Sequence, residues 1–174
     1  RPNGAVNSVM PLLDGKILVG GSFSSLRPRG LGSPIQRRNL AKLLADGTMD
    51  YSYTTDANGE DTCLAPGREG GYLVGGVFSQ FQSNSGYGSL NKSVLAWLDD
   101  RNSFSTLASI AFPFTWTGAP GIQSLASTVA GTSVIGRFTG INTPGGLALL
   151  ESHGFAWIPA GPPQGDPDES FAYL

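Results

Sequence analysis

Four arginines gather in one short stretch of the sequence and could bind an acidic group. Arg27, Arg29, Arg37 and Arg38 make up four of the 11 basic residues of the chain. A guanidinium group binds a carboxylate or a phosphate through two parallel hydrogen bonds. Residues 24–38 therefore offer a surface for an anionic or protein partner. The alternatives are a solvated loop and a loop that contacts a neighbouring subunit.

A second stretch, residues 79–92, is nearly neutral and carries side chains of the kind that bind sugars. Tyr87 offers a flat aromatic face, and Gln82 and Asn84 offer amide groups that can hydrogen-bond hydroxyls. This pattern favours glycan binding as a further alternative for the same side of the molecule. Function usually resides in loops that a rigid scaffold carries.

The counts of cysteine and histidine exclude several kinds of site. Cys63 is the one cysteine and His153 the one histidine, so neither an intrachain disulfide nor a zinc site of about four such ligands can form. No nucleophile motif surrounds Cys63, and we expect a small buried apolar residue within a strand. His153 stands in a polar context that predicts a surface turn.

Acidic residues gather at 56–61, where the sequence DANGED resembles a calcium loop. It lacks the glycine at the sixth position and the distant bidentate glutamate of an EF-hand, so we expect a polar turn and no metal. A hydrolase that uses two carboxylates is the one enzyme class the counts leave open. Because no specific pair is brought together, we predict no enzymatic activity and no cofactor.

Composition narrows the class of protein further. The 174 residues carry a net charge of -2 and only 14% charged side chains, which argues against nucleic-acid and polybasic membrane partners. No apolar run approaches the roughly 18–20 residues of a membrane span. The first residue is Arg1, and no apolar signal region follows, so we expect an excised part of a longer protein. Low charge and abundant glycine favour an extracellular, cell-surface or virion location.

Three copies of one pattern position these candidate residues. The first anchor reads KILVGGSF at 16–23, GYLVGGVF at 71–78 and TSVIGRF at 132–138, with phenylalanines 55 and 60 residues apart. A second anchor reads NLAKL at 39–43, VLAWL at 94–98 and GLALL at 146–150. A repeat of this length predicts one supersecondary unit per copy.

Each copy holds four strand-like segments. An apolar stretch precedes the first anchor, and an aromatic segment follows the second anchor at Tyr51 and Tyr53, at Phe104, and at Phe155 and Trp157. Four strands per unit and no helical periodicity predict an all-β fold of three four-stranded propeller blades. The expected boundaries are 1–57 for the first blade, 58–110 for the second, 111–158 for a degenerate third, and 159–174 for a Pro-rich tail.

Glycines mark two local features of the repeat. Asp14-Gly15 lies between two apolar runs and predicts a two-residue hairpin with a type I′ turn. The paired glycines before each phenylalanine weaken a strand, so they predict a bulge or a place where neighbouring units approach closely.

The pattern resembles the delta-60 repeat, a propeller-forming family of bacterial, often secreted or surface-associated proteins. The resemblance is carried by VNSV at 6–9, DGKILVGGSFS at 14–24, NLAKL at 39–43 and ADGTMD at 45–50. The second copy loses the Asp-Gly turn, and the third has Ile135 and Arg137 in place of small residues. The resemblance implies a propeller fold and an interaction role, with no catalytic residues.

Three blades do not close a ring, since propellers have about four to eight. Other protein must therefore cover the open edges: further blades of a longer chain, copies of this chain, or neighbours in a larger assembly. We expect a non-catalytic structural module of an extracellular or virion-surface assembly that docks neighbouring subunits. The alternative is a glycan- or receptor-binding, adhesin-like module.

Overall fold

The structure is a computed structural model, and it confirms the all-β prediction with several small antiparallel sheets. It describes residues 1–27, 32–67, 71–83, 89–91, 95–98, 115–117, 121–128, 131–137, 140–142 and 155–159. These residues contain sixteen strands. Within them no helix is long and apolar enough to cross a membrane.

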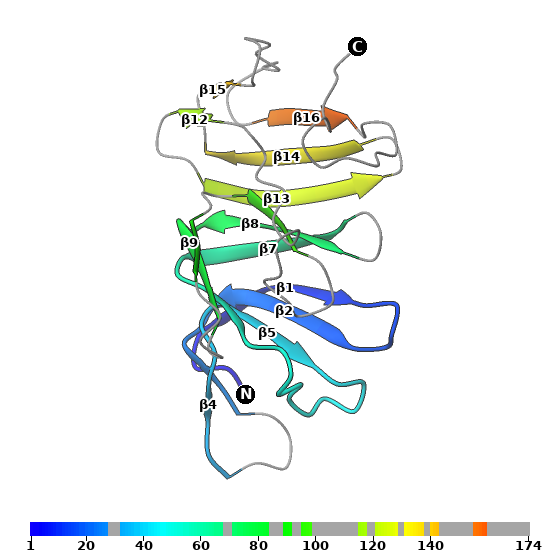
Figure 1. Cartoon of the computed structure of the whole chain (residues 1–174), viewed down its shortest axis with the longest axis vertical. Helices are drawn as coiled ribbons and strands as arrows, with labels where there is room; N and C mark the ends of the chain where they lie inside the picture. Colours follow the sequence, from blue (N-terminus) through cyan, green and yellow to red (C-terminus); the bar gives the residue numbers. More distant parts are fainter. Residues whose placement is uncertain are drawn as a thin grey trace.

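Three main sheets follow one another along the long axis of the molecule (Figure 1). Each has three antiparallel strands, and the second strand of each copy lies in the middle. The strands are β1 (Ala5–Pro11), β2 (Ile17–Ser22) and β5 (Leu40–Leu43); β7 (Glu60–Pro66), β8 (Tyr72–Val77) and β11 (Leu95–Leu98); and β13 (Gly121–Thr128), β14 (Gly131–Arg137) and β16 (Phe155–Pro159).

Smaller sheets formed by the segments between the anchors lie along one side of this stack, at the left in Figure 1. The strands are β3 (Ser25–Leu26) and β4 (Ile35–Gln36); β6 (Thr55–Ala57), β9 (Gln80–Ser83) and β10 (Ser89–Asn91); and β12 (Thr115–Thr117) and β15 (Gly140–Asn142). The repeat thus carries the segments that follow each first anchor, which include the candidate stretches 24–38 and 79–92, to the same side of the molecule.

The register of the main sheets confirms the repeat of the first anchor. In each copy the register between the first and second strands shifts at the same point of the repeat. Regular pairing resumes at Ser8 with Gly20, Cys63 with Gly75, and Ser124 with Ile135. A β-bulge adds one residue and increases the local twist. The shared bulge shows that the third copy, although degenerate in sequence, pairs like the other two.

The third strand of the third sheet differs from the sequence-based alignment. That alignment placed 146–150 beside β14 and made Phe155 and Trp157 part of a fourth strand. Instead β16 pairs with β14, where β5 pairs with β2 and β11 with β8. The sequence FAWI at 155–158 matches LAKL and LAWL of those strands. Residues 146–150 lie outside the described residues.

The first main sheet also has no regular fourth strand among the described residues, which include the whole stretch 44–57 after β5. One isolated bridge, Leu43 with Met49, continues the sheet beyond β5. Asp50 N then donates to Lys42 O at 3.0 Å, and a turn begins at Tyr51. Three strands and a short extension replace the four strands predicted for this copy, because the chain turns away after two residues.

The Asp14-Gly15 hairpin is a three-residue loop and not the predicted two-residue turn. Gly15 has a φ of 82°, whereas Asp14 does not have a positive φ. Gly15 N donates to Leu12 O at 3.0 Å, and Leu12 N donates to Lys16 O at 2.9 Å. This is a type I turn followed by a left-handed glycine, and a single left-handed residue is enough for it.

The paired glycines behave as predicted. A Cβ atom on Gly75 would lie 2.7 Å from Ile122 Cγ2, which belongs to the next main sheet. A Cβ atom on Gly21 would lie 2.2 Å from the carbonyl oxygen of Ala5, across the bulge. One glycine of the pair thus serves the contact between sheets, and the other serves the bulge.

The main core lies between the first and second sheets. It includes Met10 and Leu18 from the first sheet and Leu64, Tyr72 and Val74 from the second. Cys63 is buried in β7, as predicted, and its Sγ lies 3.3 Å from Gly75 O. Burial raises the pKa of the Cys63 thiol to about 11, which removes it as a nucleophile near neutral pH.

Candidate functional site

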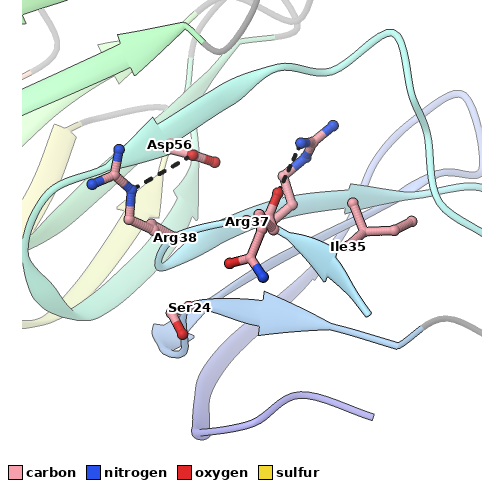
Figure 2. Close-up of a pocket in the computed structure, with 6 residues that line it drawn as sticks. Ser24, Ile35, Arg37, Arg38 and Asp56 are labelled. Carbon is pink, nitrogen blue, oxygen red and sulfur yellow. Dashed lines mark hydrogen bonds and ion pairs between the residues drawn. The ribbon is translucent and has the colours of Figure 1, made fainter. Parts of the chain in front are cut away.

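A pocket of about 620 Å³ opens where the β3–β4 hairpin meets β6. Ser24, Ile35, Gln36, Arg37, Arg38 and Asp56 line it (Figure 2). It therefore includes two of the arginines that sequence analysis singled out. It also lies on the side of the molecule that carries the small sheets.

The backbone beside the pocket has an uncommon conformation. Asn39 has a φ of 62°, and Leu40 N donates to Arg38 O at 2.7 Å, which closes a left-handed γ-turn centred on Asn39. Such turns are strained and need support. Asn39 Nδ2 supplies it by donating to Ala57 O at 2.9 Å. The turn ties the two pocket arginines to β6.

Arg37 is buried, with 8% of its surface exposed, and it holds main-chain carbonyls. Its Nη1 donates to Gln36 O at 3.0 Å, and its Nη2 donates to Tyr53 O at 3.2 Å. Its Nε has no hydrogen-bond partner among the described residues. Two of its hydrogen-bonding atoms are thus already committed to the fold.

Arg38 extends to the other side, toward Asp56 (Figure 2). Its Nε lies 3.9 Å from Asp56 Oδ2, and its side chain is 53% exposed, whereas Asp56 is buried. The two guanidinium groups thus point away from each other (Figure 2). Arg38 is therefore the pocket arginine whose charge can reach an acidic group in solution.

An asparagine positions the Ser24 end of the pocket. Asn3 Oδ1 accepts hydrogen bonds from Ser24 N and Ser25 N at 2.9 Å each, and Asn3 Nδ2 donates to Ser24 Oγ at 2.8 Å. The Ser24 hydroxyl therefore acts as a held polar group.

The same clamp recurs in the second copy, 55 residues later. Asn58 Oδ1 accepts from Ser79 N at 2.9 Å and Gln80 N at 3.0 Å, and Asn58 Nδ2 donates to Ser79 Oγ at 3.0 Å. Sequence analysis missed both asparagines, although each stands in an Asn-Gly pair before a first strand. The third copy has Ala119 at this position and lacks the amide.

The other candidate residues are placed as follows. Arg27 is exposed at the end of β3, and its backbone exchanges hydrogen bonds with Arg1. Gln82 lies in β9, opposite Asp56 and Ser89 in the small sheet. Arg29, Asn84 and Tyr87 lie outside the described residues. Glycan binding by Gln82, Asn84 and Tyr87 stays a prediction.

Comparison with known proteins supports the propeller assignment over part of the chain. Residues 12–53 match a family described as a domain of unknown function (DUF5122) beta-propeller. The match covers 42 of the 174 residues, from the first hairpin loop to Tyr53. Neither a curated protein nor a solved structure shows a significant match to the chain.

The described residues also bear on metal chemistry. Within them, no group of three or more His, Cys, Asp or Glu side chains could hold a metal ion. In the 56–61 stretch, Asp56 is paired with Arg38 and the Asn58 amide holds the backbone of Ser79.

A buried polar cluster supports the segment that carries Tyr53. Lys42 is buried with its Nζ 4.9 Å from the centre of the Tyr53 ring, and Tyr72 Oη donates to Tyr53 Oη at 2.8 Å. A cation over an aromatic face is attracted by the ring quadrupole. Asp50 precedes this segment and forms an ion pair with Lys16, whose Nζ lies 3.1 Å from Asp50 Oδ2.

We predict that Asp50 makes the fold sensitive to acid. Burial alone raises the pKa of Asp50, but hydrogen bonds from Ser52 and the charge of Lys16 outweigh burial and hold that pKa below its ordinary 3.8. A lowered folded-state pKa stabilises the protein above pH 3.8, and this stabilisation is lost as pH falls through the lowered value.

Replacing Asp50 with asparagine should therefore lower the free energy of unfolding by about 1–2 kcal/mol at pH 7. The difference from the parent should shrink at pH 3. Urea unfolding at both pH values measures it. Asp46→Asn is the comparison at an exposed carboxylate: hydrogen bonds from Thr48 lower the pKa of Asp46 as well, but solvent screens this group, so its difference between the two pH values should be smaller. An equal difference at both pH values would contradict the prediction.

Proposed function

We propose that the chain is a non-catalytic interaction module, a partial β-propeller of the delta-60 kind that docks neighbouring subunits of an extracellular or virion-surface assembly. The beta-propeller family match over residues 12–53 supports the fold, and the common register of the three main sheets supports three units of one kind. The propeller resemblance and the low charge support a surface role.

One observation carries the proposal: the contact between successive sheets is repeated, and one copy of it is left open. β7 packs against β1 and β2, and β13 packs against β7 and β8 in the same way. The first strand of each copy thus covers the preceding sheet. β1 is also a first strand, but none of the described residues covers its corresponding face.

The open face of β1 is apolar. Val9 is 60% exposed, whereas Leu64, at the corresponding position of β7, is buried. Val6 is 42% exposed, whereas Ile122, at the corresponding position of β13, is buried. Exposed apolar residues on a sheet face that is buried elsewhere in the same molecule indicate an interaction surface. Three units are also fewer than the roughly four of the smallest propellers, so a neighbour that covers β1 also extends the incomplete ring.

Site-specific photocross-linking in the organism that makes the protein tests this proposal. A photoreactive phenylalanine analogue at position 9 should form an adduct with a neighbouring protein, because Val9 lies on the open face. The same analogue at Thr128, which is exposed on the third sheet, is the matched control. Isolation of the chain as a free monomer, with no adduct from position 9, would contradict the proposal.

A further inference from the structure

The third main sheet presents an outer face that differs from the same face of the other two. This outer face is the side that receives the next sheet, and the register of the first two strands defines four equivalent positions on it. The residues at these positions are Ser8, Met10, Leu18 and Gly20 in the first sheet; Cys63, Ala65, Leu73 and Gly75 in the second; and Ser124, Ala126, Ser133 and Ile135 in the third.

In the first two sheets this face is buried by the next sheet. Met10 and Leu18 are buried in the core that they share with Leu64 of the second sheet. Ala65 and Leu73 are buried as well, on the side where β13 packs. A large apolar side chain on the second strand, Leu18 or Leu73, is thus common to both contacts.

The glycine position decides how close the next sheet can come. Ile122 of β13 lies over Gly75, where a Cβ atom would be 2.7 Å from Ile122 Cγ2 and 2.9 Å from Ile122 Cβ. In the third sheet this position is Ile135, whose side chain is 47% exposed. A further sheet docking in the same way would meet the Ile135 side chain in the space that Ile122 occupies above Gly75.

On its first two strands the third sheet also lacks the large apolar residue that the other two contacts share, while β16 pairs Phe155 with Ile135 and Trp157 with Ser133, as β11 pairs Leu95 and Trp97 in the second sheet. Ser133 stands where the other sheets have Leu18 and Leu73, and Ser124 and Ala126 beside it are exposed. Both changes therefore work against the addition of a fourth unit at this end.

We propose that the chain docks in one direction only. The third sheet is a terminal cap. The β1 face with Val6 and Val9 receives a further repeat unit, one with glycine at the position of Gly75 and a large apolar residue at the position of Leu73. This inference rests on the proposed function and adds the docking end and the chemistry of the partner. It follows that copies of this chain do not close a ring by head-to-tail contact.

A double variant of the full chain tests the inference. Ser133→Leu with Ile135→Gly gives the third sheet the outer-face residues of the second sheet. In sedimentation equilibrium the parent should remain at its monomer mass of 18.1 kDa. The double variant should self-associate with a Kd at least tenfold below that of the parent. Adding Val9→Asp should return it to monomer, because the charge then lies on the receiving face.

Ser33→Leu is the matched control, since it adds the same leucine at an exposed loop position and should leave the mass unchanged. A folded double variant that stays monomeric would overturn the inference, as would a parent that self-associates through Val9. If the double variant does not fold, Ser133→Leu with Ile135→Ala removes most of the obstructing side chain and is judged in the same way.

The two tests fail separately. Absence of a cross-link from position 9 contradicts the docking of a native neighbour. The self-association of the double variant still decides whether Ser133 and Ile135 block the third sheet. Failure of the engineered chain to associate, with a cross-link present, contradicts only the capping of the third sheet and the identity of the unit that β1 receives.

Discussion

Replacing Gly75 with valine is expected to lower the midpoint of thermal unfolding by roughly 6–12 °C, which corresponds to about 3 kcal/mol for a chain of this size. A Cβ atom at this position already lies 2.7 Å from Ile122 and 2.9 Å from Cys63 Sγ, and valine adds two methyl groups beyond it. The clash lies between the second and third sheets. One of them must move, and the contact that β13 makes with β7 and β8 is weakened.

Gly32→Val is the control, because a Cβ atom at Gly32 meets no atom within 4 Å. Thermal unfolding followed by circular dichroism should separate the two variants clearly. An equal, small effect of both substitutions would mean that Gly75 is not held by the contact between sheets. It would also remove the steric argument for Ile135 as an obstruction.

Arg37→Ala is expected to lower the free energy of unfolding by about 1–3 kcal/mol, and it should do so more than Arg38→Ala. The substitution leaves Tyr53 O and Gln36 O without the Arg37 donors, and Tyr53 O is in a buried contact. Arg38 is 53% exposed, and its 3.9 Å ion pair is long, so its loss should cost less than about 1 kcal/mol.

Urea unfolding of the two single variants measures this difference. Arg37→Lys is a useful third variant, because lysine keeps the charge but lacks the planar fork that reaches two carbonyls, and it should recover only part of the loss. A larger effect at Arg38 would contradict the supporting role of Arg37. Of these two pocket arginines, Arg38 is the suitable position for testing contact with an acidic partner.

Several features of the fold could be predicted from the sequence because they depend on local pattern. The recurring first anchor predicted the central strand of each main sheet, including the degenerate third copy. The paired glycines predicted a bulge and a close approach, and both are present at Gly21 and Gly75. Cys63 was expected to be a buried strand residue, because a lone thiol outside any nucleophile motif packs like a small apolar side chain.

Other predictions failed where several patterns compete. GLALL at 146–150 resembles the second anchor in composition, yet FAWI at 155–158 forms the third strand beside β14. An Asp-Gly pair suits two kinds of hairpin turn, and the pairing of Leu12 with Lys16 selects the longer one. Arg37 and Arg38 look equivalent in the sequence, but the fold buries Arg37 against the Tyr53 carbonyl and leaves Arg38 exposed beside Asp56.

The sequence alone thus determined the all-β class, the repeat and the positions where glycine is required, because these follow from residue periodicity and backbone sterics. Only the tertiary structure decided that Val6 and Val9 lie on an open face and that the Gly75 position, occupied by Ile135 in the third copy, faces the next sheet. The physical reason is that alternation along a strand separates its two faces, whereas the packing of the neighbouring sheet determines which face is covered.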